Sequence, residues 1–391
     1  MSTKKFNLIA ILLILTLSTT KLWAQDQTGE KQKKEMTKFN DANERKGVKF
    51  KVIPGPFYDP SIKYGMFLAP MLTYYPSKGD MISPASTTAF YGIYTSNNSY
   101  IIGMNNELYL KEDTWRLKLR AGYGNLNKDL SLYGVDENGQ LDYSQKTVQD
   151  VTQEVRQLET YAMHKVVPSL YMGLGYTYKS YGFTGNTPEA VEALENNDMN
   201  GASVNHGLAL KLDYDTRDNV QFPYKGYYMS YTGTEFFSEG QNNNAYFSNN
   251  FKMMGFWSLT KNHRHIIATK VYGNILVGDV QKQDFSIYGR INGDVQRGYQ
   301  SGTHTDKNAL NVEVEYRYTS PLLNNKLGFI AMVGDGKVFG YYNNFTDAEH
   351  LPVVALGIRY AILPYERINI RFDTTYGKDG MVWYFGIREA F

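Results

Sequence analysis

The sequence predicts an all-β fold: a transmembrane antiparallel β-barrel of about 16 strands, exported behind a cleaved signal peptide. Three observations predict it. Apolar and polar residues alternate in runs of about 10–15 residues, longer than ordinary strands. After the first 24 residues, no apolar stretch approaches the roughly 18 needed for a spanning helix. Tyr and Phe are abundant, at 33 and 20 residues, and recur near the ends of the runs, as in an aromatic girdle.

The first residues have the order of a secretory signal. Lys4 and Lys5 precede an apolar run over 6–17, and a short polar stretch leads to Ala24. We expect a signal peptide over 1–24, with a retained anchor helix as the alternative. Polar and charged residues dominate 25–48, which we interpret as a periplasmic leader or linker. Residues 49–391 form one predicted barrel domain.

The amino-acid composition argues against some classes of protein and leaves others open. The net charge of +2 gives no argument for nucleic-acid binding. Mean hydropathy is negative, which is unusual for a helical membrane protein but normal for a barrel, because only alternate residues face lipid. The absence of cysteine decides little, since soluble secreted domains can also lack it.

The run over 308–319 illustrates the predicted strands. Val312, Val314 and Tyr316 alternate with Glu313, Glu315 and Arg317, which places an apolar face toward lipid and a charged face toward the lumen. Fifteen such runs are visible, and bacterial barrels normally have an even number, so one more is expected within 49–64 or 126–148. Long outer loops are expected at 126–148, 184–203 and 279–307. The fifteen runs are 64–76, 85–96, 99–112, 114–125, 150–165, 168–182, 204–216, 224–238, 246–260, 263–278, 308–319, 326–339, 351–363, 366–378 and 380–391.

Two local motifs stand out at the ends of runs. Asp215, Arg217 and Asp218 precede Pro223 and Gly226, and we interpret them as the cap of a tight periplasmic turn with local pairing. In the last run, Phe385, Ile387 and Phe391 share one face with Trp383. A terminal aromatic residue on such a strand resembles the signal read by the barrel-insertion machinery.

A series of motifs in fixed order fills the second half of the chain. Arg297-Gly298-Tyr299 lies in the 279–307 loop, and the Glu313–Arg317 strand follows it. Asp335-Gly336 and Gly357-Ile358-Arg359 come next. This series resembles the barrel of the BamA/TamA superfamily, the bacterial surface antigen type, over roughly 50–391. Gln296 stands where the family has an apolar residue, and Lys337 where it has glycine.

The resemblance implies that the long loop folds into the barrel and that its arginine pairs with acidic wall residues. A buried guanidinium needs carboxylates to offset its desolvation. We therefore expect Arg297 to reach Asp335, with Glu315 as a second partner; the alternative is a solvent-exposed loop arginine. Arg359, Arg371 and Asp373 are expected in an interior lattice of charges.

The resemblance also implies a function at the bacterial outer membrane: aiding insertion or translocation of proteins or lipids, with a lateral gate between 380–391 and a first strand near 64–76. A passive porin-like channel and a structural surface antigen are the alternatives. Relatives carry POTRA domains before the barrel, and 25–48 is too short for one. We therefore expect outer-membrane lipid as a partner, together with a periplasmic or outer-membrane protein that supplies the POTRA function, and no nucleic acid.

No enzymatic motif is visible. There is no Gly-x-Ser-x-Gly elbow and no phosphate-binding loop. His263 and His265 are two residues apart, but no third ligand lies at metal-site spacing. We expect no enzyme activity, no catalytic residues, no metal and no cofactor.

Overall fold

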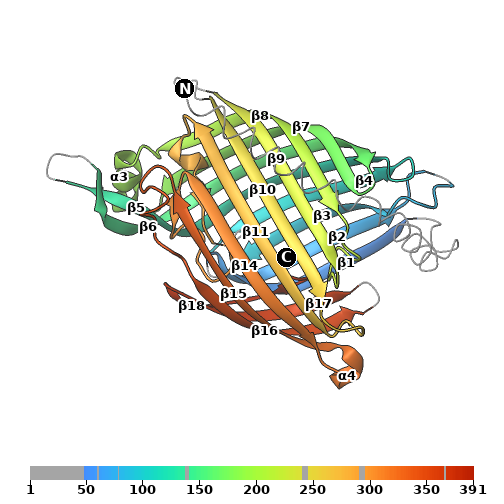
Figure 1. The fold of residues 1–391 in the computed structure, drawn as a ribbon. Helices are drawn as coiled ribbons and strands as arrows, with labels where there is room; N and C mark the ends of the chain where they lie inside the picture. Colours follow the sequence, from blue (N-terminus) through green and yellow to red (C-terminus); the bar gives the residue numbers. More distant parts are fainter. Residues whose placement is uncertain are drawn as a thin grey trace.

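The computed structural model describes residues 48–59, 61–77, 79–136, 141–239, 245–289, 296–364 and 367–391. Within them, sixteen antiparallel strands form a closed barrel (Figure 1). The expected signal peptide and leader lie outside the described residues, apart from residue 48. No helix in the described part of the chain is long and apolar enough to cross a bilayer.

The strands follow one another around the wall in chain order, and β1 meets β18 at the closure. The strands of the first half are β1 (Lys49–Asp59), β2 (Lys63–Tyr74), β3 (Ser86–Thr95), β4 (Tyr100–Leu110), β5 (Trp115–Val135), β6 (Leu141–Val167), β7 (Leu170–Gly185) and β8 (Gly201–Asp215). Those of the second half are β9 (Gly226–Glu239), β10 (Ala245–Ser258), β11 (His265–Gly278), β14 (Asn308–Thr319), β15 (Leu327–Phe339), β16 (Val353–Leu363), β17 (Ile368–Gly377) and β18 (Gly380–Ile387).

The sixteenth strand is β1, which confirms the expectation of a further strand within 49–64. The expected long loop at 126–148 is wrong, because β5 and β6 continue as a hairpin beyond the end of β4 (Figure 1). The projecting hairpin has its own small core, which explains why it stays paired. Leu130, Leu132 and Val151 pack there against Phe183 and against α3 (Pro188–Asn196).

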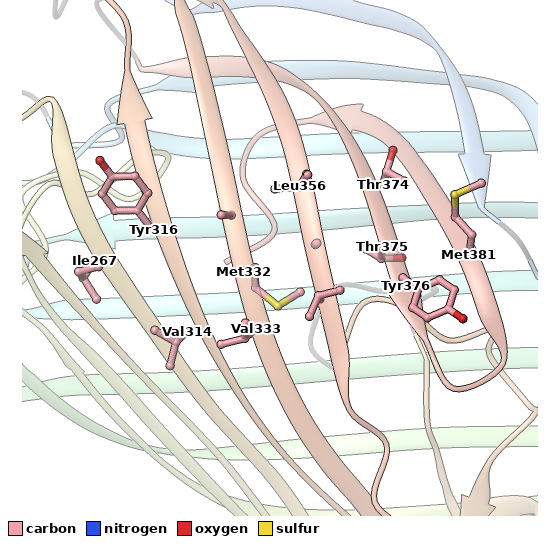
Figure 2. A pocket seen from close by; sticks show the side chains of 13 residues that line it. Ile267, Val314, Tyr316, Met332, Val333, Leu356, Thr374, Thr375, Tyr376 and Met381 are labelled. Atoms are coloured by element: carbon pink, nitrogen blue, oxygen red, sulfur yellow. The ribbon is translucent and has the colours of Figure 1, made fainter.

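The two faces of the wall differ as alternation predicts. On the outer face of β14–β18, a shallow groove of about 630 Å³ is lined almost entirely by apolar atoms (Figure 2). Leu356, Tyr376 and Met381 project from it with 69%, 64% and 67% of their surface exposed. An apolar surface of this extent suits acyl chains. On the inner face of the same strands, buried charged side chains such as Glu315 and Asp373 lie beside buried apolar ones such as Met332 and Ala355.

The wall has two distinct ends. The connections at the end where β18 finishes include the 216–225 turn and α4 (Leu322–Asn325), and we call it the turn end. The opposite end, which we call the loop end, carries α3 and the 279–307 segment, here called the long loop. The long loop contains a 3₁₀ turn at Lys282–Asp284 and a two-stranded sheet of β12 (Ser286–Ile287) and β13 (Thr305–Asp306).

Candidate functional site

Arg297 of the long loop lies inside the barrel, with 1% of its side chain exposed. Its Nη2 donates to Glu315 Oε2 at 2.6 Å and to Glu313 Oε2 at 3.2 Å. Its Nη1 donates to Asp373 Oδ2 at 3.2 Å. The loop therefore bridges β14 and β17, and the interpretation of Arg297 as a solvent-exposed loop residue is wrong.

The three carboxylates belong to a wider lattice of buried charges. Each contacts at least one further cation: Lys270 Nζ lies 2.6 Å from Glu313, and Arg317 Nε lies 2.7 Å from Glu315. Arg359 and Arg371 contact Asp373 at 2.5 and 2.6 Å, and Glu389 contacts Arg359 at 2.7 Å. The expected interior lattice of Arg359, Arg371 and Asp373 is thus present, and Asp373 is its centre. Small residues make room for it, since a Cβ on Gly357 would lie 2.2 Å from Asp373 Oδ1.

The expected pair between Arg297 and Asp335 is wrong. Asp335 lies opposite Val312 in the β14–β15 ladder and on the same strand face as the exposed Val333, so its side chain faces outward while Glu313 and Glu315 face the lumen. Its carboxylate instead accepts a hydrogen bond from His350 Nδ1 at 2.6 Å. The alternation of side chains along the strand, counted from Val333, would have excluded Asp335 as a luminal partner of Arg297. Only the folded structure shows that Asp373, among the interior acids, is a partner.

Gly298 and Tyr299 fix the loop against the strands near the closure. Gly298 has φ +100°, and a Cβ there would lie 2.3 Å from Val353 Cγ2, so both backbone and space favour glycine. Its N–H donates to the hydroxyl of Tyr384 on β18 at 2.9 Å. The buried Tyr299 hydroxyl donates to the carbonyl of Pro352 at 2.6 Å.

The following residues tie the loop to the rim of the loop end. Ser301 N donates to Ser61 Oγ at 2.7 Å, in the turn between β1 and β2. His304 Nε2 lies 2.8 Å from Asp379 Oδ2, in the turn between β17 and β18. That hydrogen bond lowers the pKa of the Asp379 carboxyl, against the opposing effect of burial. The long loop therefore crosses the lumen. It is bound inside the barrel through Arg297 and at the rim through Ser301 and His304.

The closure between β1 and β18 is the weakest seam of the wall. The two strands share one paired position, Tyr58 opposite Phe385. On their other sides they are fully joined: β1 pairs with β2 from Lys49 to Asp59, and β18 pairs with β17 through Gly380. Beside the single pair, the ring of Tyr58 stacks on Trp383 with centroids 3.7 Å apart. The expected gate position at 64–76 is wrong, because that run is β2.

Two features of the sequence account for the short seam. β1 contains Pro54 and Pro56, which have no amide hydrogen to donate. Its ladder with β2 is unbroken, so we infer that these prolines present their missing donors to the seam, as prolines of edge strands do. In addition, β18 ends at Ile387, and Arg388 has φ +69° and turns the chain inward. The ladder between β1 and β18 is therefore limited to the pair of Tyr58 and Phe385.

The last four residues, 388–391, lie at the lumen and not on the outer face. Glu389 bonds Arg359 and Asn369, and the carbonyl of Phe391 accepts from Arg317 Nη2 at 2.7 Å. The Phe391 ring packs against Met254, Phe256 and Ala268. The expected common face of Phe385 and Phe391 is therefore wrong, since the turn at Arg388 reverses the alternation. The side chain of Ile387 lies outside what the structure describes.

The predicted turn motif occupies the 216–225 connection at the turn end. Asp215 and Arg217 form the expected local pair, with Arg217 Nη2 2.7 Å from Asp215 Oδ2. Asp218 caps the turn by accepting from Tyr224 N, but it also contacts Arg367, which lies between β16 and β17, at 2.7 Å. Gly226 has φ +108°, and Pro223 is buried within the turn. The motif thus links two separate turns, which local sequence could not show.

These features define a class: an outer-membrane-type β-barrel whose long outer loop enters the lumen and pairs an arginine with acidic wall residues. The model of the Omp85 superfamily domain matches residues 85–359, and the chain belongs to this superfamily. No curated protein matches the chain. This identification agrees with the resemblance that the motifs predicted.

Two solved structures share the fold. BamA from Haemophilus ducreyi lacking POTRA domains 1–3 aligns with a TM-score of 0.56 and 12% identity, over 88% of this chain and 70% of that one. CdiB from Acinetobacter baumannii aligns with a TM-score of 0.54 and 12% identity, over 88% of this chain and 60% of that one. At such identity the likeness concerns the fold alone.

Proposed function

We propose that this barrel aids the insertion or translocation of polypeptides or lipids at the outer membrane, and that the β1–β18 seam is where they pass into the bilayer. One observation carries the proposal: the two seam strands meet at a single paired position, Tyr58 opposite Phe385. Unpaired backbone groups in lipid are costly, so a wall with one short seam separates there first.

The occupied lumen favours passage of the substrate through the side of the barrel over passage along the barrel axis. The long loop crosses it, and Arg297 is buried among three carboxylates. A barrel of this strand number is wide enough for an aqueous channel when empty, but an ion-paired loop obstructs that path. The seam lies beside the apolar outer groove, which includes Met381 of β18 (Figure 2). The proposed function involves no covalent chemistry.

A disulfide across the seam tests the proposal. The chain has no cysteine, and opposed residues of an antiparallel pair lie within disulfide reach. We expect Tyr58→Cys with Phe385→Cys to abolish the function in oxidising cells and a reductant to restore it. The readouts are the levels of other outer-membrane proteins and the lipid asymmetry of the host membrane. Tyr376→Cys with Met381→Cys is the matched control, because it joins β17 to β18 without touching the seam.

Full function in the locked protein would contradict the proposal. Single-channel recording addresses a passive pore: a steady large conductance unaffected by deleting 290–305 would favour it. The proposal includes a companion protein that delivers the substrate to the turn end. Pull-down from detergent-solubilised membranes, followed by identification of the captured protein, tests that part separately.

A further inference from the structure

The long loop contacts both sides of the seam within four residues. At one end of the stretch, Gly298 N donates to Tyr384 Oη of β18 at 2.9 Å, and the same hydroxyl lies 3.4 Å from the carbonyl of Tyr299. At the other end, Ser301 N donates to Ser61 Oγ at 2.7 Å, 240 residues away in sequence. Ser61 and Tyr384 are 1% and 2% exposed. Both contacts are therefore protected from water.

We propose that residues 298–301 form a clasp that holds the seam shut, with Tyr384 and Ser61 as its two attachment points. The inference rests on the proposed function, in which the seam opens. β1 and β18 share only one paired position of their own. The loop supplies a second connection between them that does not depend on the strand ladder.

The clasp is a rigid bracket because the loop is fixed on either side of it. Arg297 is bound to Glu315 and Asp373 in the lumen. The Tyr299 hydroxyl is bound to the Pro352 carbonyl, and Gly302 O accepts from Ser131 N of the projecting hairpin at 3.1 Å. Three peptide units span at most roughly 11 Å. The stretch therefore has little slack, and widening the seam must break the bond at Tyr384 or the bond at Ser61.

Each attachment can be removed without changing the shape of the side chain much. Tyr384→Phe deletes the hydroxyl on β18, and Ser61→Ala deletes the one on the β1–β2 turn. A typical buried hydrogen bond changes an equilibrium by about fivefold. We expect each variant to raise the open population of the seam about fivefold, and both together by roughly 30-fold if the contributions add.

Hydrogen–deuterium exchange of the full-length chain in nanodiscs measures this opening, since exchange rates follow the open population. We expect exchange in β18 to rise by those factors, while β10 exchanges as in the wild type. Tyr288→Phe is the matched control: it removes a hydroxyl that donates to Gln296 of the same loop at 2.8 Å but does not touch a seam strand. Unchanged exchange in the double variant, or an equal rise in the control, would overturn the clasp.

The seam-locking disulfide keeps the two proposals distinguishable. If the clasp variants speed exchange as expected but locking the seam has no effect on the host membrane, the proposed function fails and the clasp stands. If locking abolishes function while the clasp variants leave exchange unchanged, the clasp fails and the proposed function stands. The singly substituted proteins suffice for the decision if the double variant does not fold.

Discussion

Removing Arg297 should destabilise the barrel less than removing Asp373, although Arg297 makes contacts to three carboxylates. The reason is the charge balance of the lattice. Its side chains in the described part of the chain comprise five cations (Lys270, Arg297, Arg317, Arg359 and Arg371) and four carboxylates (Glu313, Glu315, Asp373 and Glu389). Without Arg297, four cations face these four side-chain carboxylates, and Arg317 also donates to the main-chain oxygen of Phe391. Each carboxylate then retains a cation within 2.7 Å.

The magnitudes follow from what each substitution leaves unpaired. Arg297→Met loses one contact of 2.6 Å and two of 3.2 Å but also removes a buried charge, so we expect a cost of about 2 kcal/mol in unfolding free energy. Asp373→Asn leaves three buried guanidiniums, of Arg297, Arg359 and Arg371, without their shared carboxylate. Breaking a buried pair in this way costs about 4 kcal/mol.

Urea unfolding in detergent micelles, followed by heat-modifiable migration and tryptophan fluorescence, measures the difference. A cost for Arg297→Met equal to or above that for Asp373→Asn would refute the charge-balance reasoning. Double-mutant cycles add a sharper comparison. Arg297 with Glu315 should show coupling above about 1 kcal/mol, whereas Arg297 with Asp335 should be additive within about 0.5 kcal/mol, since those two side chains lie on opposite faces of the wall.

Three further outcomes follow from the structure. Leu356→Arg on the outer face should cost about 3 kcal/mol of folding free energy in vesicles, whereas Val220→Arg, comparably exposed in the 216–225 turn, should cost little; equal effects would contradict a lipid-facing wall. Asp379→Asn should lower the melting temperature at neutral pH. Because the folded pKa of Asp379 is depressed, its contribution is present above about pH 4 and is lost as the pH falls further, so the two melting curves should converge there. Lys128→Met should raise the melting temperature, because the buried Lys128 amine has no hydrogen-bond partner among the described residues; a fall would show that its attraction to the Asp59 carboxylate and the Phe183 ring dominates.

The wall could be predicted from the sequence because alternation is a local property. Fifteen of its strands were visible as runs, whereas β1 was expected only within one of two segments, because Pro54 and Pro56 interrupt its pattern. The luminal position of Glu313 and Glu315 followed from the same alternation. The contact of Arg297 with Asp373 could not be predicted in this way. Several strands carry acidic residues on their inner faces, and only the packing of the folded chain shows which of them Arg297 reaches. The inward turn at Arg388 could not be predicted either, because a single residue with a left-handed backbone conformation leaves no periodic signal in the sequence.

The strong and weak contacts of this barrel lie in different parts of its wall. Their positions decide which part of the wall can open at a low cost in free energy. Buried ion pairs join β11 to β14 and β16 to β17 directly, and Arg297 of the long loop joins β14 to β17. Among the contacts described across the seam are one paired position, the Tyr58–Trp383 stack and the two bonds of the clasp. With about 1 kcal/mol for the ring stack and about 1 kcal/mol for each hydrogen bond, opening the seam costs only a few kcal/mol. These contributions sum to about 4 kcal/mol, which leaves the open state populated at roughly 0.1%. The lattice of charges can therefore keep the rest of the wall intact while the seam opens, because none of its ion pairs joins β1 to β18.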